Sequence, residues 1–420
     1  MQRSRQAGLA LVAGALAVIP ALALAATPRT VLTSVGPNQQ VNGTSSTFWR
    51  SLSGNGTRAL FTVDDDGLPG ADGTRDVYLR DLETEKTRLV SRASGGDPAS
   101  ESSGDDPAIS GNGRFVAFST GSANLPGGEG GIFVRDLKSK RTRLVSVNNE
   151  GEPAGGSAGR PVLSANGRFV SFEADDDDLP GEDGTLDAYI HDREKGKTSL
   201  ISKATDGTPV DTDSPPNPSV SGSGRFVAFE SDSDVLPGAD AAHEVFLRDR
   251  RKGTTTLISR TPGGGPAPGQ LGGGGAVSSD GRFVAFESSA ASLGAHPSGS
   301  AFLRDRERKT TRLASRTAEG DAAIGTTASV SANGRYVVYE SEDDELAGTD
   351  GTTDVFRYDR KMRKTILLSR SSGGQAGADD SFYVSISGGG GFVVFTSRAD
   401  NLANGEDESV ANTFVRGPLG

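Results

Sequence analysis

The sequence contains no cysteine, three histidines and one tryptophan among its 420 residues. Without cysteine, the chain cannot form disulfides, iron–sulfur clusters or thiolate zinc sites, and it has no thiol nucleophile. The histidines, His191, His243 and His296, leave little room for a histidine-rich metal centre. Glycine (58) and proline (20) together stay below the share typical of low-complexity chains, and the 34% of hydrophobic residues can build a core.

The N-terminal segment has the pattern of a secretory signal peptide. Two arginines precede an apolar run over residues 7–24, which is followed by the small residue required before a cleavage site. We therefore expect residues 1–25 to be removed on export and residues 26–420 to form the mature protein, secreted or periplasmic. A retained membrane anchor is the alternative, because the run is near the lower length limit for crossing a bilayer.

The mature protein would carry a net charge of −13, since two arginines leave with the signal peptide. An exported protein this acidic is a poor candidate for binding nucleic acid or anionic membranes. We expect a monomer without stable membrane insertion, whose ligand is a protein or glycan in the cell envelope or outside the cell.

One phrase recurs seven times, in the form Ser-Gly-Asn-Gly-Arg-Phe-Val-Ala-Phe at residues 110–118. The other copies begin at Ser53, Ser164, Ser221, Ser278, Ser331 and Ser387. Successive copies therefore lie 57, 54, 57, 57, 53 and 56 residues apart. A period this regular over nearly the whole mature chain indicates an array of similar units with no separate second domain.

Each unit is expected to contain four strands. A short strand of small residues, such as 107–110, leads through a two-residue Asn-Gly or Asp-Gly turn into a second strand, such as 225–229. The second and third strands, the latter as in 132–134, are apolar on both faces and must be covered on both. The fourth strand, such as 142–146, alternates polar and apolar residues, as an exposed edge strand does.

Sheets of this kind stack around an axis as a β-propeller. The last unit ends after its third strand, at residues 413–415, whereas residues 29–34 match the fourth-strand pattern ahead of the first unit. We therefore predict an all-β, closed, seven-bladed propeller of four-stranded antiparallel blades, in which the N-terminal strand completes the last blade. An open solenoid is the alternative, but it would leave residues 29–34 without a blade.

The phrase Ser-x-Asn/Asp-Gly-Arg-Phe-Val-Ala-Phe, followed by Val-Phe-x-Arg-Asp and Thr-x-Leu-x-Ser, resembles a known repeat. It is similar to the WD40-like repeats of the TolB-like propellers of exported bacterial proteins. The resemblance covers residues 29–416 and implies the propeller fold. TolB itself carries a separate N-terminal domain, which we do not expect in this chain.

The loops between second and third strands concentrate negative charge. Four of them together carry a charge of −24: residues 62–76, 173–187, 230–244 and 340–354. These loops share one end of an antiparallel blade, and the basic turns after the third strand, as at 135–141, share the other. We therefore predict a disc with one acidic and one basic end, and a ligand at the acidic end or over the channel mouth. The alternative is that these loops only keep an exported protein soluble.

Three acidic loops contain an Asp-Gly-Thr-x-Asp pattern downstream of an acidic run. Oxygen ligands spaced around a glycine turn suit Ca²⁺, although the full EF-hand pattern is absent. The candidate calcium ligands are Asp72, Asp76, Asp183, Asp187, Asp350 and Asp354. The alternative is that the first aspartate nucleates a turn and the second ties the start of the third strand to neighbouring backbone.

An Arg-Asp pair follows the third strand in several blades, as at residues 135–136, and we expect it to form hydrogen bonds between blades. No Ser-His-Asp triad or Gly-x-Ser-x-Gly elbow is recognisable in the sequence, which favours a non-enzymatic binding or scaffold module. The alternative is a metal-assisted lyase or hydrolase that acts on carbohydrates or esters through loop carboxylates of the same face. Its candidate catalytic residues are His243, Asp240 and Glu244.

Overall fold

The computed structural model describes residues 27–35, 44–47, 50–64, 67–103, 106–128, 130–154, 157–181, 184–210, 215–239, 243–267, 275–346, 348–349, 351–403 and 410–420. The predicted signal peptide lies outside these ranges. Within them the helical content is a single 3-10 turn, η1 (Ala291–Leu293), and no helix has the length and apolar character needed to cross a bilayer.

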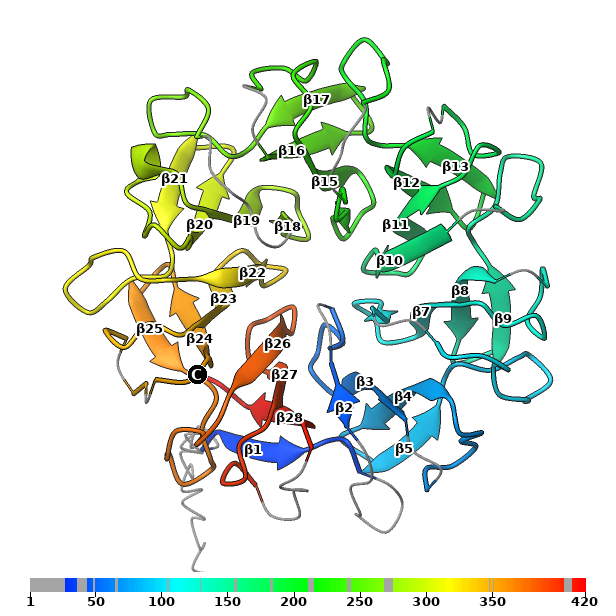
Figure 1. Ribbon diagram of the computed structural model, residues 1–420, viewed down its shortest axis with the longest axis horizontal. Helices are drawn as coiled ribbons and strands as arrows, with labels where there is room; N and C mark the ends of the chain where they lie inside the picture. Colours follow the sequence, from blue (N-terminus) through cyan, green and yellow to red (C-terminus); the bar gives the residue numbers. More distant parts are fainter. Residues whose placement is uncertain are drawn as a thin grey trace, which may run out of the picture.

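Seven antiparallel sheets of four strands each surround a central axis (Figure 1). This arrangement confirms the predicted seven-bladed propeller. Within a blade the chain runs from the innermost strand outward, and the blades follow one another around the ring in sequence order. We number the blades 1–7 from the sheet that begins with β2.

The strands of blades 1–3 are β2 (Ser45–Ser46), β3 (Arg58–Asp64), β4 (Arg75–Asp81) and β5 (Lys86–Leu89); β6 (Ala108–Ile109), β7 (Phe115–Thr120), β8 (Gly131–Asp136) and β9 (Arg141–Leu144); β10 (Ser157–Leu163), β11 (Phe169–Asp175), β12 (Asp187–Asp192) and β13 (Lys197–Leu200). The strands of blades 4–6 are β14 (Ser219–Val220), β15 (Phe226–Ser231), β16 (Glu244–Asp249) and β17 (Thr254–Leu257); β18 (Ala276–Val277), β19 (Phe283–Ser288), β20 (Ser300–Asp305) and β21 (Thr310–Leu313); β22 (Thr326–Val330), β23 (Tyr336–Ser341), β24 (Asp354–Asp359) and β25 (Lys364–Leu367). Blade 7 consists of β26 (Ser381–Ile386), β27 (Val393–Ser397), β28 (Asn412–Gly417) and β1 (Arg29–Leu32).

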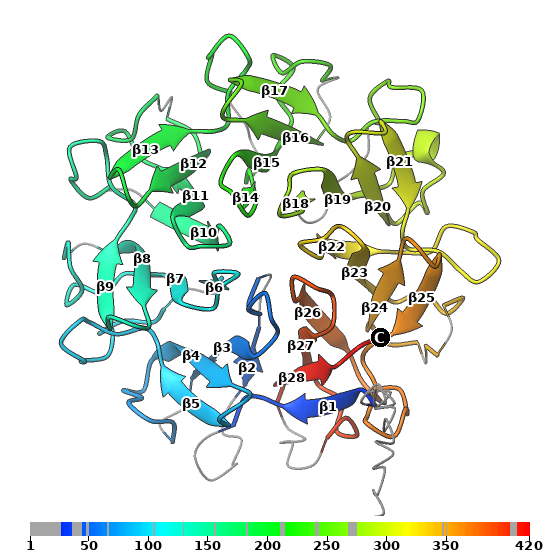
Figure 2. The same ribbon diagram turned by 180° about the vertical axis from the view of Figure 1, so that it is seen from behind.

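The N-terminal strand closes the ring, as predicted. β1 pairs antiparallel with β28, with Arg29 opposite Gly417 and Leu32 opposite Phe414, and both views show the two strands side by side (Figures 1 and 2). The Arg416 guanidinium donates to the Thr30 hydroxyl at 2.6 Å. Blade 7 therefore takes strands from both ends of the chain.

The turn between first and second strands differs from the two-residue hairpin that the Asn-Gly dipeptide indicates. In blade 2 the Gly113 N–H donates to the Ser110 carbonyl at 2.8 Å, and only the glycine of the dipeptide has a positive φ (+67°). The Asn112 side chain accepts hydrogen bonds from the Ser110 hydroxyl at 2.7 Å and the Arg114 N–H at 3.0 Å. These side-chain bonds make a wider turn favourable, and asparagine acts here as an acceptor and not as a left-handed residue.

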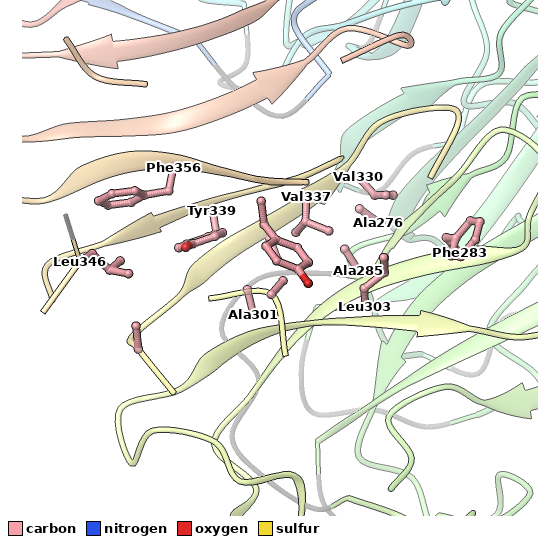
Figure 3. Packing of buried hydrophobic residues seen from close by; sticks show 14 of the residues in the cluster. Ala276, Phe283, Ala285, Ala301, Leu303, Val330, Val337, Tyr339, Leu346 and Phe356 are labelled. Carbon is pink, nitrogen blue, oxygen red and sulfur yellow. The ribbon is translucent and has the colours of Figure 1, made fainter. Parts of the chain in front are cut away.

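Each blade has one aromatic face and one face of smaller aliphatic residues. The aromatic face carries a pair of stacked rings from the second and third strands, with centroids 5.7–5.9 Å apart. Between blades 5 and 6, Tyr339 and Phe356 pack in one cluster with Ala285, Ala301 and Leu303 (Figure 3). Because strand residues alternate in direction, the valine and the last phenylalanine of Phe-Val-Ala-Phe point to one interface, and the first phenylalanine and the alanine point to the next.

In six of the seven blades, the glycine of the first turn also serves the contact between blades. A Cβ on Gly167, whose φ is +74°, would lie 2.2 Å from the ring of Phe115 in the preceding blade. The same relation joins Gly56 to Phe392, Gly224 to Phe169, Gly281 to Phe226, Gly334 to Phe283 and Gly390 to Tyr336. The repeated glycine is therefore required both by its backbone conformation and by the neighbouring blade.

Two adjacent residues of β1 test the closure. Leu32 is 7% exposed within the core of blade 7, whereas Val31 is 49% exposed. We expect Leu32→Ser to lower the free energy of unfolding by about 2–5 kcal/mol and the control Val31→Ser to change it by less than about 0.5 kcal/mol. Urea denaturation measures both, and equal effects of the two substitutions would contradict the pairing of β1 in blade 7.

Candidate functional site

The loops between second and third strands are anchored at their base. Six of them insert a leucine into the core: Leu68, Leu125, Leu179, Leu236, Leu346 and Leu402. Asp176 accepts a hydrogen bond from the Asp178 N–H at 2.8 Å, and Asp343 accepts one from the Glu345 N–H at 2.9 Å. Asp177 and Asp178 remain exposed. We call the end of the disc formed by these loops the acidic face; it presents carboxylates to solvent from well-packed turns.

The second aspartate of the Asp-Gly-Thr-x-Asp pattern ties the third strand to the fourth. In blade 1 the Ser91 hydroxyl donates to Asp76 at 2.5 Å and accepts from the Val77 N–H at 2.9 Å. Ser202 with Asp187 and Ser369 with Asp354 are the equivalent pairs. Burial raises the pKa of Asp76 to about 7, and the Ser91 hydrogen bond opposes this rise. All three aspartates are therefore buried, and each accepts a hydrogen bond from a serine that follows the fourth strand of its own blade.

The first aspartate of the pattern nucleates a turn. Asp72 accepts hydrogen bonds from the Thr74 N–H at 3.1 Å and the Thr74 hydroxyl at 2.7 Å. Asp183 and Asp350 lie outside the described residues. Among the described residues, no three His, Asp or Glu side chains are grouped so that they could hold a metal ion. Calcium binding by these loops stays a prediction.

The candidate catalytic residues do not form a common group within the described part of the chain. His243 Nε2 lies 3.5 Å from Glu230 Oε2, a carboxylate that was not recognised from the sequence. Glu244 is fully buried as the first residue of β16, opposite Ser231, and occupies the position that Asp354 has opposite Ser341 in blade 6. Asp240 lies outside the described residues.

Four consecutive blades carry a buried glutamate near the end of the second strand. These residues, Glu173, Glu230, Glu287 and Glu340, form what we call the glutamate arc. In the remaining blades the position holds Thr62, Ser119 and Thr396. A sequence signal existed, because each glutamate directly follows the last aromatic residue of the repeated phrase. Strand alternation turns these side chains away from the aromatic face and toward the next blade.

The glutamates hold the first strand of the next blade. Glu340 accepts hydrogen bonds from the Tyr383 N–H at 2.7 Å and the Val384 N–H at 3.4 Å, and Glu287 accepts one from the Thr327 N–H at 3.4 Å. Tyr383 and Thr327 both have φ +56° and lie where the register of the strand pair shifts. A bulge releases N–H groups from the strand ladder, and the carboxylates accept hydrogen bonds from them.

Burial raises the pKa of both Glu287 and Glu340 to about 7. For each carboxyl, the backbone hydrogen bonds oppose the rise. The charges of Glu230 and Glu340 add to the rise at Glu287, so the members of the arc are electrostatically coupled.

A polar network continues the arc across blades 2–4. Arg160 lies 3.7 Å from the Asp106 carboxylate and 3.6 Å from that of Glu173. Arg160 also donates to the Asn217 side-chain oxygen, and the Asn217 amide donates to Glu230 at 2.8 Å. Arg160 and Asn217 are the equivalents, in their own blades, of Thr327 and Tyr383. All four residues lie four positions before the repeated serine. This position therefore supplies polar side chains next to the glutamate arc.

The centre of the ring is narrow. A cavity of about 110 Å³ is lined by all seven blades, with one branched aliphatic residue from each: Leu52, Ile109, Leu163, Val220, Val277, Val330 and Ile386. Arg50 of blade 1 reaches across to the Ser219 hydroxyl of blade 4, and burial lowers the pKa of Arg50 to about 10. Small-molecule pockets usually have about 300–1,000 Å³. The cavity at the centre of the ring is therefore smaller than a usual small-molecule site.

The opposite end, which we call the basic end, is cross-linked by arginines. Arg114 donates to both oxygens of Asp136, at 2.8 and 2.6 Å, within one blade. Arg135 donates to the Arg92 carbonyl at 3.1 Å in the connection that leaves blade 1. The expectation that the Arg-Asp pair links blades is therefore correct for Arg135 and Arg248, whereas Arg80 and Arg304 donate to threonines of their own blade. It is wrong for Asp136, because the arginine of the first turn in the same blade donates to this carboxylate.

Comparison with known proteins supports the fold and leaves the function open. No protein-family model and no curated protein matches the sequence. Among solved structures, the chain is similar to oligogalacturonate lyase from Vibrio parahaemolyticus, with 15% identity over 93% of this chain and 96% of that one and a TM-score of 0.54. The propeller domain of the Trilobed protease from Pyrococcus furiosus, described as having an open velcro topology, has 11% identity over 89% and 96% with a TM-score of 0.55. TolB from Acinetobacter baumannii also matches, with 12% identity over 82% and 77% and a TM-score of 0.42.

The raised pKa of Glu340 predicts a pH-dependent stability. Its value of about 7 in the folded protein lies above the ordinary 4.5, so the unfolded chain loses this proton first as pH rises. Its contribution to stability is complete below about pH 4.5 and is lost by about pH 7. We therefore expect Glu340→Gln to lose less stability than the wild type between pH 5 and 7.

Urea denaturation at pH 5, 6 and 7 measures this difference. The matched control, Glu345→Gln, removes the same charge from an exposed side chain of the acidic face and should keep the wild-type pH slope. Parallel pH profiles for the wild type and Glu340→Gln would show that burial of this carboxyl is not linked to proton binding.

The predicted calcium sites can be tested by titration. If the acidic loops bind Ca²⁺, millimolar Ca²⁺ should raise the melting temperature, because a ligand that binds only the folded state stabilises it. Asp72→Asn should reduce this rise, since it removes one candidate ligand charge. The same titration with Mg²⁺ controls for general charge screening, and an unchanged melting temperature in Ca²⁺ excludes the sites.

Proposed function

We propose that the protein is an exported, non-enzymatic binding module whose acidic face holds a cationic segment of a partner protein. One observation carries this proposal: exposed carboxylates stand on anchored loops around a channel too narrow for a ligand of ordinary size. A surface of one charge sign attracts a partner of the opposite sign and raises the rate of association.

The composition of the exposed surface favours a protein over a glycan. Among the described residues, the exposed large hydrophobic side chains are Val31, Val235, Met362 and Tyr383. Only Tyr383 is aromatic, whereas sugar rings are commonly bound by stacking on several aromatic side chains. Charge is the property that the acidic face offers in quantity, so lysine- and arginine-rich segments are the ligands that match it.

A metal-assisted carbohydrate- or ester-active enzyme on the same face is the weaker alternative. Glu244 has no exposed surface and could not reach a substrate. At 15% identity, the likeness to oligogalacturonate lyase extends to the fold and not to the reaction. The contact between His243 and Glu230 is compatible with a polar interaction that holds the loop.

Binding of a cationic probe tests the proposal. We expect a fluorescein-labelled octalysine peptide to bind at low ionic strength. The double substitution of Asp177 and Asp178 to asparagine should weaken this binding roughly three- to tenfold, because two exposed charges contribute on the order of 1 kcal/mol together. Fluorescence anisotropy measures the affinity, which should fall as salt is added.

The matched control removes two exposed carboxylates from the basic end, by substituting Glu83 and Glu85 with glutamine. This variant has the same net charge as the first, and it should bind the peptide within about twofold of the wild type because charges far from the contact are screened. Equal losses in the two variants would mean that only net charge matters and that the acidic face is not a site.

A further inference from the structure

The basic end contains a groove between blades 2 and 3. It has a volume of about 310 Å³, and its lining includes Phe115, Asp136, Arg141, Arg143, Arg168 and Arg193. This groove lies at the opposite end of the disc from the acidic face, so its chemistry is independent of the function proposed above.

One wall of the groove is the outer strand β9. Arg141 and Arg143 are two residues apart and therefore project from the same side of the strand. Both side chains are exposed, and neither makes a side-chain hydrogen bond or ion pair with another described residue.

The floor of the groove is an aromatic ring covered by arginine. The Arg193 guanidinium carbon lies 4.4 Å from the centroid of Phe115, and this guanidinium donates one hydrogen bond, to the Gly167 carbonyl at 2.5 Å. Its remaining N–H groups have no partner among the described residues. Burial lowers the pKa of Arg193, and the nearby charges of Arg143 and Arg114 lower it further, although Asp136 opposes them.

The two carboxylates in the groove are already paired. Asp136 accepts both hydrogen bonds of Arg114 and a further one from the Ser139 hydroxyl at 2.9 Å. Glu194 lies 2.6 Å from Arg168. The groove therefore keeps a surplus of positive charge on Arg141, Arg143 and Arg193, with donors available for an added anion.

The other blades provide an internal comparison. None of blades 3–6 has two arginines at the positions of Arg141 and Arg143. The residues there are Lys197 and Ser199 in blade 3, Thr254 and Thr256 in blade 4, Thr310 and Arg312 in blade 5, and Lys364 and Ile366 in blade 6. Blade 1 has Lys86 and Arg88 there, but Arg58 and Leu137 replace the aromatic ring and the arginine of the floor. Among the described residues, only the groove between blades 2 and 3 combines two wall arginines with an arginine-covered ring.

We propose that this groove binds a phosphate or sulfate group, either free or as an ester on a larger molecule. A tetrahedral oxyanion offers several acceptor oxygens, and guanidinium groups donate to such anions in pairs of parallel hydrogen bonds. An anion between Arg141, Arg143 and Arg193 would also relieve the repulsion among them. The covered aromatic ring holds Arg193 in place before the anion arrives.

Calorimetric titration of the full mature protein with sodium phosphate, at constant ionic strength in sodium chloride, tests this site. We expect saturable binding that Arg143→Thr weakens roughly tenfold, as loss of a charge-assisted contact requires. The matched control is Arg312→Thr, which removes the same charge from the equivalent position of blade 5 and should stay within about twofold of the wild type. Both side chains are exposed, and thermal unfolding confirms that each variant is folded.

Two further titrations identify the source of the group. If glucose 1-phosphate binds more tightly than inorganic phosphate, the site recognises an esterified group on a larger molecule. If inorganic phosphate binds more tightly, the site recognises a free oxyanion. Glucose 6-sulfate and inorganic sulfate are compared in the same way. The proposal is overturned if phosphate and sulfate give no saturable binding beyond that of chloride, or if Arg312→Thr weakens binding as much as Arg143→Thr. Octalysine binding at the acidic face is measured on the same variants and should not change, so this site and the proposed function can fail separately.

Discussion

Each sheet of this protein is apolar on both faces, and the rest of the structure depends on covering both. A ring satisfies this requirement for all seven blades, because the aromatic face of one blade packs on the smaller face of the blade before it. Closing the ring requires that the two ends of the chain associate, and β1 meets this requirement by pairing with β28 in blade 7. The repeated alanine and glycine follow from the same constraint, since a larger side chain at Gly167 would strike the ring of the neighbouring blade.

Because equivalent strands run in the same direction in every blade, equivalent loops gather at the same end of the disc, and the two ends differ in charge. All loops between second and third strands emerge at one end and all turns between third and fourth strands at the other, so any bias in the repeat is multiplied around the ring. At the acidic end, burial of the glutamate arc would be unfavourable without partners, but its carboxylates accept hydrogen bonds from N–H groups that the bulged first strands release. At the basic end, arginines stack on the aromatic residue at the start of the second strand in blades 2–6.

Local patterns in the sequence predicted the fold and its closure, because the repeated phrase specifies strand, turn and both faces within each unit. The buried aspartates were harder to interpret: the position of Asp76 is clear from the pattern, but its partner Ser91 lies on another strand, and an acidic loop suggests a metal equally well. The glutamate arc was missed because its partners belong to the next blade; Glu340 and Tyr383 are 43 residues apart. Arg50 and Ser219, which meet across the channel, are 169 residues apart and share no pattern.

The two ends can act independently because of the thickness of the disc. A second strand of six or seven residues spans about 20 Å at roughly 3.3 Å per residue, whereas exposed charges are screened beyond about 8 Å at physiological ionic strength. Between the ends lie apolar interfaces and a narrow channel lined by seven aliphatic side chains and by Arg50. A cationic segment on the acidic face and an oxyanion in the groove between blades 2 and 3 would therefore bind without competing. If both proposals hold, the ring would present one charged partner at each of its two ends.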